Sequence, residues 1–174
     1  MLTYIVMTII GADRPGLVQL VATRLADHGG NWLESRMGRL GGQFAGIVRA
    51  EVEADKADEL TKALHALEVN GLRVIVHTES EAEHAAAGLA ATLSVVGQDR
   101  PGILRAVSAV FTTHAVNVEE LSSERVSAPM GGGTLFQATI TVSATSAEAL
   151  AEVQSDLEKI ATDLMVDLKL DSGD

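Results

Sequence analysis

A short run of residues that could bind a charged ligand occurs twice in this chain. Asp13–Gly16 and Asp99–Gly102 both read Asp-Arg-Pro-Gly, and each lies between an apolar stretch and a segment with helical spacing. The first amides of a helix have no acceptor inside the helix, and their partial positive charge suits a carboxylate. The aspartate beside them could accept a hydrogen bond from an ammonium group. Together these groups would suit an α-amino acid.

The same loop also has an interpretation that needs no ligand. Asp13 and Asp99 could cap the helix by accepting hydrogen bonds from its first amides. Each proline would suit the first helical turn, where no N–H is required, and each glycine would allow close packing. The two interpretations are compatible, so the motif alone does not choose between them.

The loop belongs to a longer internal repeat with an offset of 86 residues. Nine of the 24 residues from 11 to 34 are identical to residues 97 to 120, and His28 pairs with His114 and Asn31 with Asn117. Self-similarity at a fixed offset is the signature of duplicated structural units. We therefore expect one module at 1–79 and a second at 89–174, with a linker at 80–88. The second copy carries an insertion at 128–133.

Each copy predicts the element order βαββαβ. Strands are indicated by apolar residues at every second position, and helices by apolar residues three and four positions apart. Gly41-Gly42 is a two-residue hairpin signal between two of the strands. We expect an α+β fold made of two ferredoxin-like modules, each an antiparallel four-stranded sheet with both helices on one face. The ranges expected to be strands are 2–10, 31–40, 43–53 and 72–78, and in the second copy 89–96 and 164–170.

Composition excludes several classes of function. The net charge is −11 and neither half of the chain is basic, so direct binding to nucleic acid is not expected. The chain has no cysteine, which excludes disulfides, thiolate nucleophiles and zinc sites with cysteine ligands. No stretch has the length and apolarity of a membrane span, and no signal peptide is indicated. We expect a cytoplasmic protein.

The remaining candidate residues give no support for catalysis or for a metal. The five histidines, at positions 28, 65, 77, 84 and 114, have no metal-binding spacing. His28 and His114 occupy matched helix ends, where a cation favours the helix dipole, although ligand contact is an alternative. Glu119 and Glu120 are neighbours on a predicted strand and would point to opposite faces. We expect no cofactor.

The repeated unit resembles the ACT domain, a regulatory module that commonly binds amino acids. The resemblance covers both halves of the chain. It is carried by Asp-Arg-Pro-Gly followed by Leu17 or Ile103, and by the pairs His28 with His114 and Asn31 with Asn117. In amino-acid-binding members, the first polar residue of the loop and the Asn of the second strand contact the ligand at a domain–domain interface. The implied ligand-binding residues are Asp13, Arg14, Gly16, Leu17, Asn31, Asp99, Arg100, Gly102, Ile103 and Asn117.

Two such modules without an enzyme domain are similar to the glycine cleavage system transcriptional repressor family. That similarity implies a sensor that acts through a protein partner, such as a transcriptional activator, because DNA binding is not expected. The first strand, 2–10, is apolar on both sides, so we also expect the two copies to dock against each other and the chain to form a homodimer. Two other hypotheses stay open. The first is an interaction module without a ligand, and it is favoured because the loop has Asp where many ligand-binding members have Asn. The second is an enzyme that uses the ferredoxin-like cleft.

Overall fold

The computed structural model describes residues 1–79, 88–129 and 132–172. The chain divides into two compact units, with the boundary between residues 85 and 86. The expected linker, 80–88, lies outside the described residues except for Gly88. Of the expected insertion, 128–133, positions 130 and 131 lie outside the described residues.

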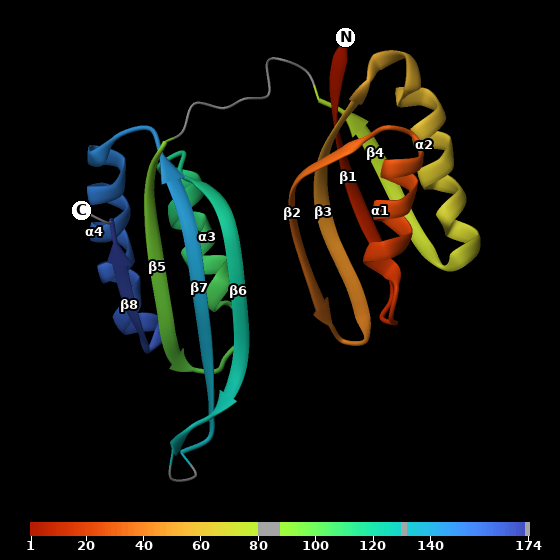
Figure 1. Cartoon of the computed structure of the whole chain (residues 1–174). Helices are drawn as coiled ribbons and strands as arrows, with labels where there is room; N and C mark the ends of the chain where they lie inside the picture. Colours follow the sequence, from red (N-terminus) through yellow and green to blue (C-terminus); the bar gives the residue numbers. More distant parts are fainter. Residues whose placement is uncertain (80–87, 130–131, 173–174) are drawn as a thin grey trace. The chain divides into compact units, whose positions relative to one another are not determined.

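Unit 1 is a four-stranded antiparallel sheet with helices on one face (Figure 1). Its strand order is β2-β3-β1-β4, so the first strand lies in the middle of the sheet. This is the predicted βαββαβ order, with short 3-10 segments before and after the second helix. The elements are β1 (Leu2–Ala12), α1 (Leu17–Asp27), β2 (Asn31–Leu40), β3 (Gln43–Glu53), η1 (Ala54–Lys56), α2 (Ala57–His65), η2 (Ala66–Asn70) and β4 (Leu72–Thr78).

Unit 2 repeats this topology with the strand order β6-β7-β5-β8. The two ferredoxin-like modules predicted from the sequence are therefore confirmed. The elements are β5 (Leu89–Gln98), α3 (Ile103–Thr113), β6 (Asn117–Ser127), β7 (Thr134–Ala144), α4 (Ala147–Leu164) and β8 (Val166–Asp171).

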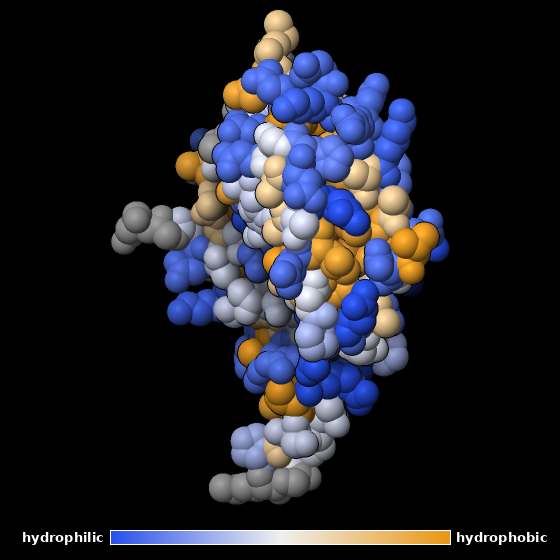
Figure 2. All heavy atoms as spheres, turned by 45° about the vertical axis from the view of Figure 1, so that its right-hand side comes forward, coloured by the Kyte–Doolittle hydropathy of each residue, from blue (hydrophilic) through white to orange (hydrophobic). Residues whose placement is uncertain are grey.

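Each unit has its own aliphatic core between the sheet and the helices. In unit 1, every second residue of β1 faces the helices and is fully buried, namely Ile5, Met7 and Ile9. α1 covers them with the helically spaced Leu17 and Val21. No polar or charged residue is buried in the described part of the chain. On the surface shown in Figure 2, hydrophobic residues are interspersed among hydrophilic ones.

Glycines fix two features of the strand ends. Gly41 and Gly42 have φ of 57° and 77°, the left-handed pair that a tight two-residue hairpin requires, so the predicted turn is confirmed. Gly11 and Gly97 occupy matched positions near the ends of β1 and β5. A Cβ on Gly11 would lie 2.5 Å from the Gly71 carbonyl oxygen, so the neighbouring backbone leaves no room for a side chain.

The last strand starts later than predicted. The apolar alternation at 164–170 suggested that Leu164 opens the strand, but Leu164 ends α4 and Val166 starts β8. Met165, between them, has φ of 51° and caps the helix in the left-handed region. The alternation was ambiguous because Leu164 also lies four residues after Ile160 and continues the apolar face of the helix.

Candidate functional site

The two Asp-Arg-Pro-Gly loops connect β1 to α1 and β5 to α3, with the same geometry. Gly16 and Gly102 are the N-cap residues, with φ of 93° and 99°. The prediction that Asp13 and Asp99 cap these helices was wrong, because neither cap carries a side-chain hydrogen bond. The prolines precede the N-cap instead of standing in the first helical turn.

The glycines are present for their backbone conformation and not for close packing. A Cβ added at Gly16 or Gly102 would meet no heavy atom within 4 Å, which contradicts the packing role expected for them. A left-handed φ is costly for any residue that carries a Cβ. The glycines therefore turn the chain into the helix, and the space on their own Cβ side is open.

Both loop aspartates are held by an arginine near the end of the second strand. Arg39 Nη1 lies 3.3 Å from Asp13 Oδ2, and Arg125 Nε lies 2.6 Å from Asp99 Oδ2. Arg39 and Arg125 are themselves separated by 86 residues. Sequence reasoning missed this matched pair, although the repeat alignment contained the signal. The loop carboxylates thus stand beside a positive charge, which uses part of their capacity to bind an ammonium group.

The loop arginines tie the opposite side of the loop to the rest of the unit. Arg14 Nη2 donates to the Asn70 carbonyl oxygen at 2.6 Å, and Arg100 Nη2 donates to the carbonyl oxygen of Asp163. Both acceptors lie near the end of the helical segment that precedes the last strand. A cation there neutralises carbonyl groups that have no partner inside the helix. Each loop is therefore fixed on two sides by the same two kinds of contact.

A hollow of about 300 Å³ opens beside the loop of unit 1. Arg14 and Gly16 line it on the loop side, and Gln19, Thr23 and Arg24 line it along the exposed side of α1. Arg14 and the start of a helix give this hollow a positive character, while Arg24, at its other end, lies 3.9 Å from the carboxylate of Asp27. Such a surface suits a small anion or a carboxylate.

Leu17 and Ile103 contribute to the site only through their backbone. Their side chains are buried in the cores of their units, at 3% and 2% exposure. Their amides come at the start of α1 and α3, ahead of the first intrahelical bonds, which run from Leu20 N to Gly16 O and from Ala106 N to Gly102 O.

Asn31 and Asn117 open β2 and β6 as predicted, but they lie far from the loops of their own units. Asn31 pairs in register with Glu51, whereas the loop follows the opposite end of β1, where Ala12 pairs with Gln43. The chain runs along β1, returns along α1 and only then starts β2. Asp13 and Asn31 of one unit therefore do not line one small cavity, and a ligand site that joins these two residue types stays a prediction.

The asparagine side chains have local partners. Asn31 Nδ2 donates to Glu51 Oε1 at 2.9 Å, and Asn117 Nδ2 donates to Glu119 Oε1 at 2.8 Å. Glu119 lies at a register shift between Val118 and Glu120, so adjacent glutamates here do not follow the simple alternation of a regular strand.

The matched histidines have different surroundings. His28 Nδ1 lies 2.8 Å from the Arg24 carbonyl oxygen, a contact within its own helical segment. His114 instead lies between two carboxylates of α4, with Nε2 2.9 Å from Asp156 and Nδ1 3.1 Å from Glu152. The hydrogen bond to Asp156 and the one to Glu152 raise the pKa of His114 above its ordinary value, against the effect of desolvation. Sequence reasoning missed this cluster because its members are far apart in the chain.

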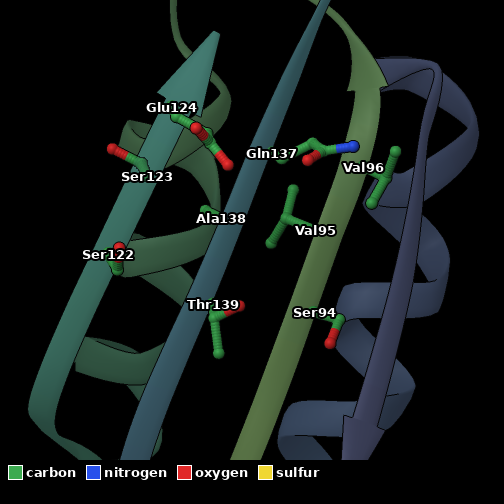
Figure 3. Close-up of a pocket in the computed structure, with 9 residues that line it drawn as sticks. All are labelled: Ser94, Val95, Val96, Ser122, Ser123, Glu124, Gln137, Ala138 and Thr139. Atoms are coloured by element: carbon green, nitrogen blue, oxygen red, sulfur yellow. The ribbon is translucent and has the colours of Figure 1, made fainter. Parts of the chain in front are cut away.

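Unit 2 has a second, polar hollow on the face of its sheet that lies away from the helices (Figure 3). It measures about 230 Å³ and contains the hydroxyl groups of Ser94, Ser122 and Thr139, from three neighbouring strands. Glu124 and Gln137 lie at one end of it (Figure 3). These small side chains leave the sheet surface shallow and hydrophilic.

Within residues 1–79, 88–129 and 132–172, no group of three or more His, Cys, Asp or Glu side chains is arranged to hold a metal ion. No helix in this described part has the length and apolarity needed to cross a membrane.

Comparison with known proteins agrees with the geometry of both units. Models of the ACT domain match residues 3–77 and residues 91–160. The chain is 26% identical over 163 residues to the glycine cleavage system transcriptional repressors of Escherichia coli K12 and Shigella flexneri, covering 92% of this chain and 85% of theirs.

Two solved structures share the fold over nearly the whole chain. A protein of unknown function from Galdieria sulphuraria superposes with a TM-score of 0.89 at 29% identity, with full coverage of both chains. A provisionally assigned glycine cleavage system transcriptional repressor superposes with a TM-score of 0.73 at 20% identity, covering 98% of this chain and 97% of its own. The repeated fold, the repeated loop and the two family matches lead to one conclusion: the chain carries two ACT domains in tandem and belongs to the ACT-domain proteins.

Proposed function

We propose that this protein is a regulatory sensor that binds an amino acid at its β1–α1 and β5–α3 loops and signals through a protein partner. The observation that carries the proposal is the duplicated loop geometry. In both units an Asp–Arg pair and an Arg–carbonyl contact fix the loop, and a left-handed glycine without a side-chain cap starts the helix. A rigid loop that presents amides at an uncrowded surface is suited to hold a carboxylate without reorganisation.

The charges around the loop define the orientation of the ligand. Its carboxylate would accept hydrogen bonds from the amides around Gly16–Leu17 or Gly102–Ile103, and Arg14 supports the negative charge in unit 1. Its ammonium group would face the carboxylate of Asp13 or Asp99. The side chain of the amino acid would extend into the hollow along α1, where Gln19 and Thr23 offer polar contacts.

Asn31 would take part in a ligand site only with a loop other than that of its own unit. It lies at the end of the sheet opposite Asp13, so the two residues of one unit cannot reach one small ligand. We therefore place the ligand between the loop of one chain and the asparagine of a second copy, within a homodimer. This arrangement agrees with the domain–domain ligand site that the ACT resemblance implies.

The regulatory role follows from the relatives and the charge. The curated relatives are named as transcriptional repressors of the glycine cleavage system. A net charge of −11 opposes binding to the DNA backbone, so control of transcription would run through a protein such as an activator. We place this activity in the cytoplasm and assign the chain no enzymatic reaction.

One observation favours a second candidate, an interaction module that has lost its ligand. Asp13 and Asp99 already pair with Arg39 and Arg125, so an incoming ammonium group would compete with a guanidinium. In this alternative the loops serve only to shape the ends of the domains, and the protein bridges partners without sensing a metabolite.

A panel of the twenty amino acids in a thermal-shift assay separates the two candidates. A ligand present at 100 times its dissociation constant stabilises the folded state by about 2.7 kcal/mol, which raises the melting temperature measurably. The sensor predicts that one or a few amino acids stabilise the protein, and that Asn31→Ala and Asn117→Ala reduce the effect. Ser155→Ala, an exposed change on α4, is the matched control and should keep the full shift. If no amino acid stabilises the wild type, the interaction module is the correct function.

A further inference from the structure

The two loop carboxylates that would meet the ammonium group of a ligand already contact guanidinium groups of the same chain. Arg39 Nη1 lies 3.3 Å from Asp13 Oδ2, and Arg125 Nε lies 2.6 Å from Asp99 Oδ2. A guanidinium and an ammonium are both cations whose N–H groups donate to a carboxylate. Each arginine therefore makes the same contact that the ammonium group of an amino acid would have to make.

Both arginines occupy the same place in their sheets. Arg39 pairs in register with Phe44 on β3, and Arg125 pairs with Phe136 on β7. The connections beyond them differ, because two residues join β2 to β3, whereas residues 128–133 join β6 to β7. An arginine that served only to shape the turn would not need to keep its position when the turn changes. The repeated contact therefore serves the loop that carries the aspartate.

The two members of each pair are held with different firmness. The side chains of Asp13 and Asp99 are 31% and 25% exposed, whereas those of the two arginines are 72% and 67% exposed. The backbone also fixes the aspartates. Asp13 N donates to the Gly42 carbonyl oxygen at 2.9 Å, and Asp99 N donates to that of Thr134 at 2.9 Å. The aspartate therefore keeps its place, while the arginine is free to turn into water.

An exposed ion pair of this kind is a weak competitor. Water screens its charges, and holding a long side chain in one position costs conformational entropy, so such a pair changes an equilibrium constant by a factor of about two to five. A ligand that also binds through its carboxylate can overcome a competitor of that strength. The contact therefore lowers the affinity of the site without closing it.

The second arginine of each loop has a different role. Arg14 and Arg100 donate to the carbonyl oxygens of Asn70 and Asp163, on the other side of the loop. These contacts hold the loop against the helical segment before the last strand, and they leave the loop aspartate untouched. Only Arg39 and its counterpart in unit 2 are placed to compete with an ammonium group.

We propose that Arg39 and Arg125 form an autoinhibitory contact: each occupies its loop aspartate until the ammonium group of an incoming amino acid displaces it. The inference rests on the proposed function and adds a form of regulation to the same site. A carboxylic acid that lacks the amino group leaves the arginine in place. The contact therefore sets the ligand concentration at which the site responds, and the ligand must carry an ammonium group to displace the arginine.

The first test compares binding to the wild type and to the double variant Arg39→Gln/Arg125→Gln, in which both aspartates remain. The probes are the twenty amino acids, measured by isothermal titration calorimetry with the full chain. The double variant should bind the same amino acid as the wild type about two- to fivefold more tightly, which is the factor by which an exposed pair competes. The corresponding carboxylic acid without the amino group should bind both proteins equally.

Arg73→Gln is the matched control. Arg73 pairs in register with Ile10, at the end of β1 that leads into the loop, so the variant removes one positive charge from the same end of unit 1. Its partner is Glu68, at 3.7 Å, and both side chains are 70% exposed. This variant should bind amino acids as the wild type does. An equal gain in affinity for Arg73→Gln would show a general effect of charge and overturn the autoinhibitory contact.

The outcomes separate the autoinhibitory contact from the function on which it rests. Tighter binding by the double variant, or binding by the double variant alone, supports both. Equal or weaker binding by the double variant overturns the autoinhibitory contact and leaves the sensor function standing. If neither protein binds any amino acid, the proposed function is overturned, and the autoinhibitory contact with it. Circular dichroism checks that each variant keeps the fold.

The second test follows the arginine itself by ¹⁵N spectra of the arginine Nε–H groups. Arg125 Nε lies 2.6 Å from Asp99, and Arg49 Nε lies 2.8 Å from Glu79, which makes Arg49 a matched control on the sheet of unit 1. A saturating amino acid should shift the Nε–H signal of Arg125 and speed its exchange with water, and it should leave the signal of Arg49 unchanged. If the Arg125 signal stays as it was, the arginine is not displaced and the proposal is wrong.

Discussion

The left-handed glycine at each loop gives a prediction that can be worked out from the structure. Gly16→Ala and Gly102→Ala place a Cβ where φ is 93° and 99°, with no heavy atom within 4 Å of it. Any loss of stability must therefore come from backbone strain and not from a clash. A left-handed conformation costs a residue with a Cβ about 1–2 kcal/mol. For a domain of this size, each kcal/mol lowers the melting temperature by about 4–8 °C.

Gly38→Ala is the matched control, because its Cβ also meets nothing within 4 Å but its φ is not left-handed. Alanine in a strand costs less chain entropy than glycine, so this variant should be as stable as the wild type or slightly more stable.

Differential scanning calorimetry and urea unfolding should show that Gly16→Ala lowers the transition of unit 1 and Gly102→Ala that of unit 2. The expected loss lies between about 1 and 2 kcal/mol for each. Two results would refute the reasoning: loop variants as stable as the wild type, or a loss for Gly38→Ala equal to theirs. Either would mean that the left-handed turn does not determine the loop.

Three further predictions concern charge and packing. Asp156 and Glu152 raise the pKa of His114, so unit 2 should lose stability as the pH rises from about 6 through this raised pKa. Urea unfolding measured at a series of pH values should show this loss in the wild type and not in His114→Asn. Gly97→Ala would bring a Cβ within 2.7 Å of the Met165 carbonyl oxygen, so it should destabilise unit 2 by more than the loop variants in urea unfolding. The purified protein should not shift duplex DNA at physiological salt in an electrophoretic mobility assay, and a submicromolar, salt-sensitive complex would contradict the inference drawn from its charge.

The fold was predictable because its signals were local and occurred twice. Alternating apolar residues in β1, helical spacing in α1 and Gly41-Gly42 at the hairpin each predicted an element that the structure contains. The end of α4 was not predictable in the same way. Leu164 satisfies both the helical and the strand pattern, and the choice depends on the left-handed cap at Met165.

The candidate residues of the site stay a prediction, and their arrangement could not be read from the sequence. The loop residues carry the expected types, yet the N-cap is Gly16 and the carboxylate of Asp13 faces Arg39. Nothing local distinguishes an aspartate that caps a helix from one that pairs with a strand two elements further along. The separation of Asp13 and Asn31 could have been derived from the predicted element order, because the helix between them returns the chain to the other end of the sheet, but it was not part of the prediction.

Contacts between distant segments were outside the reach of sequence patterns. His28 and His114 were matched by the repeat, but only His114 meets two carboxylates from the second helix of its unit. The sheet faces that lie away from the helices likewise differ between the two units, although their strands correspond. Position 75 is isoleucine and its counterpart, 169, is lysine, a difference that gains meaning only once the register shows which residues are neighbours.

The most direct measurement of the central claim is a titration of the ¹⁵N-labelled protein with the amino acid that stabilises it most, followed by amide chemical shifts. The account predicts that the largest changes occur at Gly16–Gln19 and at Gly102–Leu104, where the first helix amides would hold the ligand carboxylate. The smaller changes should extend to Asn31 and Asn117. Two results would contradict a ligand site at these loops. The first is that the largest changes occur elsewhere, such as around Thr139 on the sheet face of unit 2 that lies away from the helices. The second is that no amino acid causes any change at millimolar concentration.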